Sequence, residues 1–373
     1  MNDIFVSKTQ LELLPARVLL AEKTNASVEL YNSIYRLSNI KKRKQIKILV
    51  VGSGGSYPAA VFAKHELSAE MRTPYVDAVT PQTAIQIITQ FNIVAFCSYA
   101  PEYDLVIGIS YSGKTADIKA VADLCATRGF PFILLTGTNK QDLEDFYTES
   151  ELVKIISYFN SDDSSGREEG MISMASTIIP CMILDDTSSN KLIALNQKAL
   201  SAGKSFVDEL NISEIAKQIK KHPIIHVFYD WNTYAVAADI ESKFTQSGIA
   251  NVILHEKKNF SHGRYTSLYN QKFAMIIDLT WYCSVLGSKD KVYRTKYEKE
   301  LAIFLKDVCD ANSSCYINIG TSPLTVVQWI IEALAIIPYF ITAIGEELGI
   351  DISNPLIPFP KETTKLYNYN GWF

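Results

Sequence analysis

Short runs of β-branched and other apolar residues alternate with stretches of helical length along this chain, and this alternation limits the possible folds. Residues 46–51, 104–109 and 132–136 are three such runs, each with the length and composition of a buried strand. Residues 57–71 and 115–128 lie between them and have the length of helices. Strands that alternate with helices of this length pair in parallel through crossover helices. The sequence therefore predicts an α/β chain with a doubly wound parallel sheet.

The same pattern starts again in the second half of the chain. Three further strand-like runs are followed by a long apolar helix: residues 224–228, 273–278, 314–319 and 326–344. Aligning the two halves at a period of 177 residues places Ser56-Tyr57 on Thr233-Tyr234. This period is too long for a solenoid repeat. It predicts two tandem copies of one domain.

Length and composition also fit two globular domains. The chain has 373 residues, of which 47% are hydrophobic and 20% charged. We expect a first domain over residues 1–205, which includes helical residues 1–40, and a second domain over residues 206–348. The prolines in the tail, residues 349–373, prevent a regular helix, and its aromatic side chains predict that it packs back over the protein.

Charge and motif content exclude several classes of protein. A net charge of −4 provides no basic field for nucleic acid. The apolar stretch 326–344 is interrupted by Gln328, Glu332 and Pro338, which predicts a core helix rather than a membrane span. Six cysteines without CxxC spacing, together with no signal sequence, predict a cytoplasmic protein. Histidines and cysteines do not cluster at zinc spacing, so no metal and no cofactor are predicted.

Two turns are rich in glycine and hydroxyl groups, and each lies between a predicted strand and a predicted helix. Helix N-termini and glycine-rich turns favour phosphate because their backbone amides converge on an anion. In a doubly wound sheet both turns fall at the carboxyl ends of strands, where ligands bind. The candidate phosphate-binding residues are Gly54, Gly55, Ser56, Ser110, Tyr111, Ser112 and Thr115.

A dinucleotide site fits these turns less well. The pattern Gly52-x-Gly54-x-x-Tyr57 has tyrosine where the fingerprint requires its third glycine, and the second turn would have no role. The equivalent turn of the second half, residues 229–233, has bulky side chains and an acid. A phosphate is therefore predicted in the first half.

Three segments resemble those of the SIS (sugar isomerase) domain family. Ser110–Thr115 looks like the family's S-x-S-G-x-T phosphate loop, residues 54–57 resemble its first loop, and residues 165–173 resemble its third segment. The layout is most similar to the isomerase half of glucosamine-6-phosphate synthase and to related deglycases and deaminases. The resemblance implies two tandem SIS-type domains, with Glu168 and Ser173 near a bound sugar phosphate.

The resemblance extends to residues 234–246 of the second half. Asp239 matches a family acid, Lys243 matches the family lysine, and Gln246 stands where the isomerases have a catalytic glutamate. Glu241 is the alternative catalytic acid on the same helix, and it could act as the base only if the site is re-aimed, because five residues place it roughly 140° away around the axis.

Two further residues are implied by the same resemblance. His262 in the Phe260–Gly263 loop matches the family's ring-opening histidine, which reaches across a dimer interface in the synthase. Lys361 or Lys365 matches the family's C-terminal active-site lysine; the spacing leaves this choice open. A homodimer or higher homo-oligomer is expected, with a phosphosugar as partner and neither nucleic acid nor membrane.

Two functions remain open from the sequence. The first is an enzyme acting on a sugar phosphate or amino-sugar phosphate, as an isomerase, deaminase or deglycase, in which Lys243 or a tail lysine forms a Schiff base or stabilises charge. The second is a non-catalytic sugar-phosphate sensor, because the amide of Gln246 cannot take the proton that an isomerase base must accept.

Overall fold

The computed structural model describes ten parts of the chain, namely residues 5–41, 46–70, 75–94, 103–148, 150–159, 168, 172–185, 190–281, 296–320 and 325–355. These residues divide into two compact units. The first unit takes the described residues within 13–168 and 175–197. The second unit takes those within 1–12, 169–174 and 198–355.

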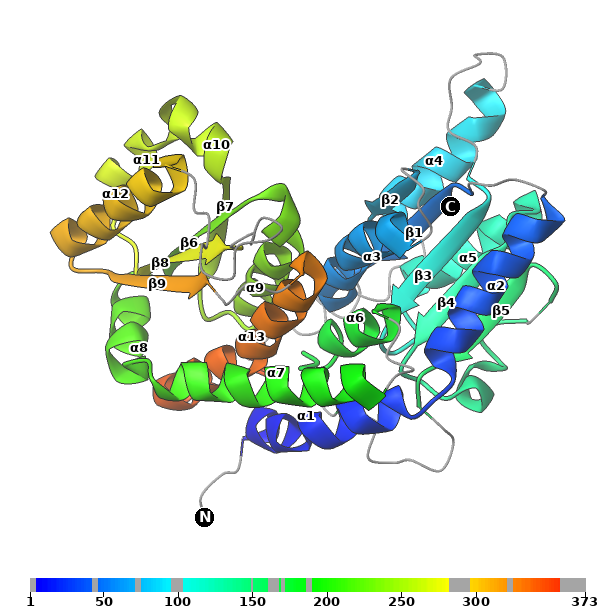
Figure 1. Ribbon diagram of the computed structural model, residues 1–373, viewed down its shortest axis with the longest axis horizontal. Coiled ribbons are helices and arrows are strands. Elements are labelled where there is room, and N and C mark those ends of the chain that lie inside the picture. Colours follow the sequence, from blue (N-terminus) through cyan, green and yellow to red (C-terminus); the bar gives the residue numbers. More distant parts are fainter. Residues whose placement is uncertain are drawn as a thin grey trace. The chain divides into compact units, whose positions relative to one another are not determined.

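The first unit contains a five-stranded parallel sheet with the order β2-β1-β3-β4-β5 (Figure 1). Its strands are β1 (Ile48–Gly52), β2 (Val76–Val79), β3 (Leu105–Ser110), β4 (Phe132–Thr136) and β5 (Val153–Ser157). The first strand along the chain, β1, lies inside the sheet. The second strand, β2, pairs with one side of β1 at the edge of the sheet, and the third strand, β3, pairs with the other side of β1. The strand order therefore reverses between β1 and β3, and the carboxyl ends of strands at such a point are where open α/β sheets bind ligands.

Helices cover both faces of this sheet. The helices of this unit are the end of α1 (Val6–Glu22), α2 (Ala26–Ile40), α3 (Tyr57–Glu70), α4 (Pro81–Val94), α5 (Ala116–Arg128) and α6 (Ile178–Leu184). Apolar residues of α4 and α5, among them Ile88 and Val121, pack on Leu49 and Val51 of β1. Alternate residues of a strand point to opposite faces, and α3 packs against β1 and α6 on the other face. The predicted doubly wound arrangement is confirmed.

The helical N-terminal segment is interrupted, although a helix was expected throughout residues 1–40. α1 ends at Glu22 and α2 begins at Ala26. The Thr24 hydroxyl donates to the Ala21 carbonyl at 2.7 Å and accepts from the Ala26 amide at 3.3 Å. Threonine side chains compete in this way with the helical backbone pattern.

The second unit contains a four-stranded parallel sheet with the order β7-β6-β8-β9 (Figure 1). Its strands are β6 (Ile224–Tyr229), β7 (Asn251–Glu256), β8 (Met275–Thr280) and β9 (Cys315–Gly320). Its helices are α7 (Asn190–Asp208, which begins in the first unit), α8 (Ile212–Lys221), α9 (Tyr234–Gln246), α10 (Lys257–Asn259), α11 (Thr266–Asn270), α12 (Lys296–Asn312) and α13 (Val326–Leu348). This order repeats that of the first four strands of the other sheet.

The predicted correspondence between the halves holds at their first turns. β1 is followed by a 3-10 turn, η1 (Gly54–Ser56), and then α3; β6 is followed by a 3-10 turn, η4 (Trp231–Thr233), and then α9.

Strands β2, β5 and β7 were not predicted, and all three are edge strands. Strands β2 and β7 are only partly buried, so they lack the continuous apolar run that marks a central strand.

Helix α13 has the length and apolar composition of a membrane span, but 78% of its most apolar window is buried within the protein. Trp329, Ile337 and Phe340 are among its buried residues. This burial agrees with the prediction of a core helix.

Candidate functional site

The two hydroxyl-rich turns meet at the carboxyl ends of β1 and β3. These strands are neighbours in the sheet, and Gly52 at the end of β1 lies opposite Ile109 of β3. The backbone amide of Tyr111 donates to the Ser56 hydroxyl at 3.4 Å. Two segments separated by more than fifty residues are thus in contact at this edge of the sheet.

The turn after β3 is folded around its own hydroxyl groups. The Gly113 amide donates to Ser110 Oγ at 3.1 Å, and Ser110 Oγ lies 2.9 Å from Thr115 Oγ1. Gly113 has a φ of 65°, and a Cβ there would lie 2.8 Å from Thr136 Oγ1, so glycine is required at this position. Ser110 is buried whereas Ser112 is exposed at the surface. The turn can therefore present the Ser112 hydroxyl to a ligand.

Two carbonyl oxygens of the same turn are already bound. Thr138 Oγ1 donates to the Ser112 carbonyl at 2.7 Å, and the Tyr147 hydroxyl donates to the Gly113 carbonyl at 2.8 Å. Carbonyl oxygens repel a phosphate, so their engagement by other donors favours an anion at the amides and hydroxyls of the turn.

The first turn is held close to the segment before α6. Gly54 has a φ of 52°, and a Cβ on Gly55 would lie 2.7 Å from Ser176 Oγ. Thr177 Oγ1 donates to the Gly55 carbonyl at 2.6 Å. Both glycines of the predicted phosphate set thus have a steric reason to be glycine.

A buried ion pair next to the second turn involves Glu168. Its Oε1 lies 3.2 Å from Nη1 of Arg17 in α1, and both side chains are 2% exposed. Glu168 also accepts from the Ala175 amide at 3.1 Å. Burial, followed by the negative charge of Glu168, raises the pKa of Tyr111 well above its ordinary value. Glu168 therefore pairs with Arg17, and the sequence did not indicate this pair. Glu168 also lies near Tyr111, the residue between Ser110 and Ser112.

These turns lie within a segment that matches a known family. Residues 40–149 match the SIS domain family. This matched segment lies within the first unit. The matched segment includes both turns, from Gly54 to Thr115. No curated protein sequence matches this chain.

Solved structures with the same fold extend beyond the SIS domain and cover almost the whole chain. The C-terminal domain of glucosamine-fructose-6-phosphate aminotransferase from Francisella tularensis matches with a TM-score of 0.62 and 14% identity, over 94% of this chain and 97% of that chain. Tagatose-6-phosphate ketose/aldose isomerase from Escherichia coli matches with a TM-score of 0.61 and 12% identity, over 95% and 97% of the two chains. Glucosamine-6-phosphate deaminase from Thermotoga maritima matches with a TM-score of 0.59 and 14% identity, over 93% and 96%. At these identities the similarity concerns the fold.

The predicted residues of helix α9 lie outside the matched segment, in the second unit. Lys243 Nζ forms an ion pair with Asp239 one turn earlier, and their side chains are 2% and 1% exposed. Glu241 is half-buried, and Gln246 is exposed at the end of the helix. Lys243 is thus a buried, paired lysine and not a solvated one.

The other predicted residues of the second unit are dispersed. His262 is exposed in the segment Phe260–Arg264, beside Gly263 with a φ of 106°. Ser173 belongs to the second unit and not to the unit that contains the SIS domain. Lys361 and Lys365 lie outside the described residues.

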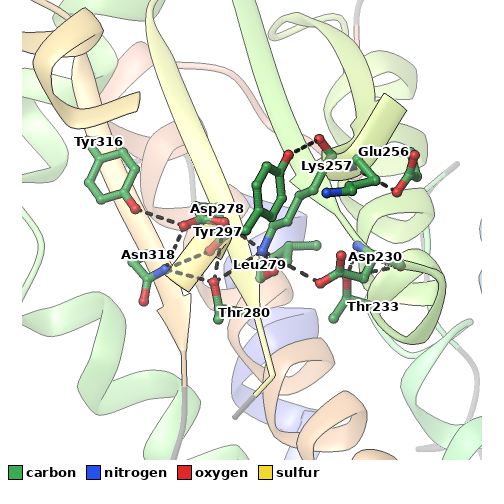
Figure 2. Close-up of polar contacts among 11 residues, drawn as sticks. Asp230, Thr233, Glu256, Lys257, Asp278, Leu279, Thr280, Tyr297, Tyr316 and Asn318 are labelled. Carbon is green, nitrogen blue, oxygen red and sulfur yellow. Dashed lines mark hydrogen bonds and ion pairs between the residues drawn. The ribbon is translucent and has the colours of Figure 1, made fainter. Parts of the chain in front are cut away.

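A polar cluster at the carboxyl ends of the second sheet was not predicted (Figure 2). At its centre is Lys257, which directly follows β7 and has a side chain that is 2% exposed. Its ammonium group lies 2.9 Å from Asp278 Oδ1, 2.5 Å from the Leu279 carbonyl and 3.3 Å from Thr280 Oγ1. The other oxygen of Asp278 accepts from the Tyr316 hydroxyl at 2.9 Å and from Asn318 Nδ2 at 3.2 Å. The sequence analysis did not single out Lys257, which lies in the polar run Glu256-Lys257-Lys258-Asn259.

Proposed function

We propose that the first unit binds a sugar phosphate, whose phosphate group contacts Ser56, Ser110, Ser112 and Thr115. The observation that supports this proposal is the convergence of the two turns, through the contact of Tyr111 with Ser56, at the strand-order reversal of the sheet. The match of residues 40–149 to the SIS domain and the fold shared with sugar-phosphate enzymes agree with this ligand class.

The proposed reaction class is isomerisation, deamination or deglycation of a sugar phosphate or amino-sugar phosphate. His262 would open the sugar ring, Glu168, Ser173 and Asp239 would contact the sugar, and Lys243 or Lys361 would stabilise charge or form a Schiff base. The alternative is a non-catalytic sugar-phosphate sensor. That alternative is favoured by Gln246, because an amide cannot act as the base of an aldose–ketose isomerase.

The proposal includes a domain and assembly scheme. Residues 1–205 form the phosphate-binding domain and residues 206–348 the second SIS-type domain; most of the tail, residues 349–373, lies outside the described residues. The protein acts in the cytoplasm as a homodimer or larger homo-oligomer, in which the exposed His262 loop lies at an interface between copies.

Calorimetric and thermal-shift titrations with hexose and hexosamine 6-phosphates test the ligand class. A saturating sugar phosphate at a hundred times its Kd stabilises the folded protein by about 2.7 kcal/mol. The same sugars without phosphate should give no saturable signal. Ser112→Ala should weaken binding by roughly ten-fold or more, because a hydrogen bond to a charged group is lost.

Ser205→Ala is a matched control, because Ser205 is an exposed serine on α7, outside both turns. It should bind like the unchanged protein. Equal binding by the Ser112→Ala and unchanged proteins, or no binding of any sugar phosphate by folded protein, would contradict the phosphate site. NMR spectra of a bound sugar phosphate over time then separate the two functions, since product signals indicate an enzyme and unchanged signals indicate a sensor.

A further inference from the structure

The two turns of the first unit extend past the paired part of the sheet, so contacts beyond the strands must hold them together. The last pair of residues in the register of β1 and β3 is Gly52 and Ile109. Beyond it, the Tyr111 amide donates to Ser56 Oγ at 3.4 Å, which is longer than the usual range for such a bond. This contact is therefore a weak restraint on the distance between the turns.

A stronger hydrogen bond joins the first turn to the helix that follows the second turn. Ser53 Oγ donates to Asp117 Oδ2 at 2.9 Å. Hydrogen bonds to a carboxylate are roughly twice as strong as those between neutral groups. Asp117 lies in the first turn of α5, two residues after Thr115 at the N-cap. The bond thus ties the start of the first turn to the helix N-terminus at which the second turn ends.

The Ser53 side chain is not used to cap its own turn. Ser53 is the N-cap residue of η1, a position where a serine oxygen commonly accepts from the amides that follow, but it makes no such bond. Its carbonyl accepts from the Ser56 amide at 3.0 Å. The position of Ser53 therefore sets that of Ser56, and the Ser53 hydroxyl is directed at Asp117 instead.

The Asp117 carboxylate also places a negative charge near the proposed phosphate site. Both of its oxygens have donors, since Oδ1 accepts from the Ile118 amide at 2.8 Å and Oδ2 accepts from Ser53. Its charge opposes phosphate binding, whereas its hydrogen bond to Ser53 favours binding by holding the turns together. These two effects have opposite signs when the carboxylate is removed, so the direction of the change in affinity decides between them.

We propose that Ser53 and Asp117 are positioning residues for the phosphate site, and that their hydrogen bond holds the two turns at the separation that one phosphate group requires. This inference rests on the proposed function and deepens it, because neither residue belongs to the set that contacts the phosphate. Asp117 acts through Ser53, and Ser53 acts through Ser56.

Calorimetric titrations of the full chain with D-glucose, D-fructose and D-glucosamine 6-phosphates test this proposal. For whichever of the three binds the unchanged protein most tightly, Ser53→Ala and Asp117→Ala should each weaken binding by about ten-fold, because a hydrogen bond to a charged group is lost. The double variant should also weaken binding by about ten-fold, since both substitutions remove the same bond. Ser53→Thr keeps the hydroxyl group, and the extended backbone of Ser53 suits threonine, so this variant should retain binding.

Asp123→Ala is the matched control, because this exposed carboxylate of α5 pairs with Lys119 of the same helix. It should bind like the unchanged protein. Hydrogen exchange without any sugar phosphate supplies a second readout. The Tyr111 amide should exchange about ten-fold faster in Ser53→Ala, whereas the Ile107 amide of β3 should keep its protection. A general loss of stability would accelerate exchange at both amides.

Tighter or unchanged binding by Asp117→Ala overturns the proposal, as does an additive loss of about a hundred-fold in the double variant. Unchanged exchange of the Tyr111 amide in Ser53→Ala overturns it as well. If none of the three sugar phosphates binds the folded, unchanged protein, the proposed function fails, and the exchange of the Tyr111 amide still decides whether the bond between Ser53 and Asp117 holds the turns together.

Discussion

Replacing Lys257 tests how strongly the second unit depends on one buried ion pair. The Lys257 side chain is 2% exposed and its ammonium group has three hydrogen-bond partners, of which Asp278 is charged. Lys257→Met keeps most of the aliphatic volume but leaves the Asp278 carboxylate buried without its cation. Removing one partner of a buried pair costs about 3–5 kcal/mol, whereas an exposed pair contributes about 0.2–1 kcal/mol.

We therefore expect Lys257→Met to reduce the free energy of unfolding of the second unit by about 3–5 kcal/mol. Native-state hydrogen exchange of the β8 amides measures this unit by itself, because β8 is its central strand beside β6. Lys258→Met is the matched control, since the neighbouring Lys258 is exposed. It should change the free energy by less than about 1 kcal/mol.

A second variant distinguishes an unpaired charge from lost packing. In the double variant Lys257→Met/Asp278→Asn, the buried carboxylate of Asp278 is replaced by an uncharged amide. Part of the lost free energy of unfolding should therefore return. A cost below about 1 kcal/mol for Lys257→Met would refute the reasoning, because it would mean that water already solvates this pair.

Two further predictions concern pH. Burial lowers the pKa of His226 to about 3 and that of His255 to about 4, and their rings are joined by a hydrogen bond of 2.8 Å. The unfolded chain takes up these protons near pH 6.5 and the folded chain does not, so their stabilising effect is complete above pH 6.5 and is lost as the pH falls towards about 4. His255→Phe should make the fall in the free energy of unfolding between pH 7 and pH 5, measured by urea titration, shallower by up to about 1.4 kcal/mol per pH unit; an unchanged slope would contradict this. Burial raises the pKa of Glu22 to about 7, against the opposing hydrogen bond from Asn196. The carboxyl group loses its proton near pH 4.5 in the unfolded chain and near pH 7 in the folded chain, so its contribution to stability is complete below pH 4.5 and lost by about pH 7. Glu22→Gln should therefore stabilise the protein at pH 8 by on the order of 1–3 kcal/mol and change little at pH 4. Thermal melts at the two pH values measure this difference, and equal effects at both would show that the carboxyl group does not titrate as stated.

The central strands and the polar turns could be predicted from local sequence. Continuous apolar runs mark strands buried on both faces, and β1, β3, β4, β6 and β8 all have this pattern. The edge strands β2 and β7 are partly solvated, and their apolar runs are shorter than those of the central strands. The turn Ser110–Thr115 was predictable because its hydroxyl groups and Gly113 are contiguous in the chain.

The partners of charged residues could not be predicted in the same way. Arg17 and Glu168 are separated by 151 positions, and neither stands in a pattern that indicates burial. Lys257 lies in a polar run that resembles a solvated helix end, yet its side chain is buried because it turns toward the carboxyl end of β8. Lys243 forms a buried pair with Asp239, and its position in the sequence does not indicate this burial.

The sequence by itself determined the α/β class, the repeat of one pattern in two halves, and the position of the two turns rich in glycine and hydroxyl groups. These features could be predicted because periodicity and turn chemistry are properties of neighbouring residues. Only the tertiary structure decided which turns meet, which acids have a cation as partner, and which lysines are removed from water. Those outcomes depend on strand order and crossover connections, which bring together residues far apart in the chain and set the solvation of each charge.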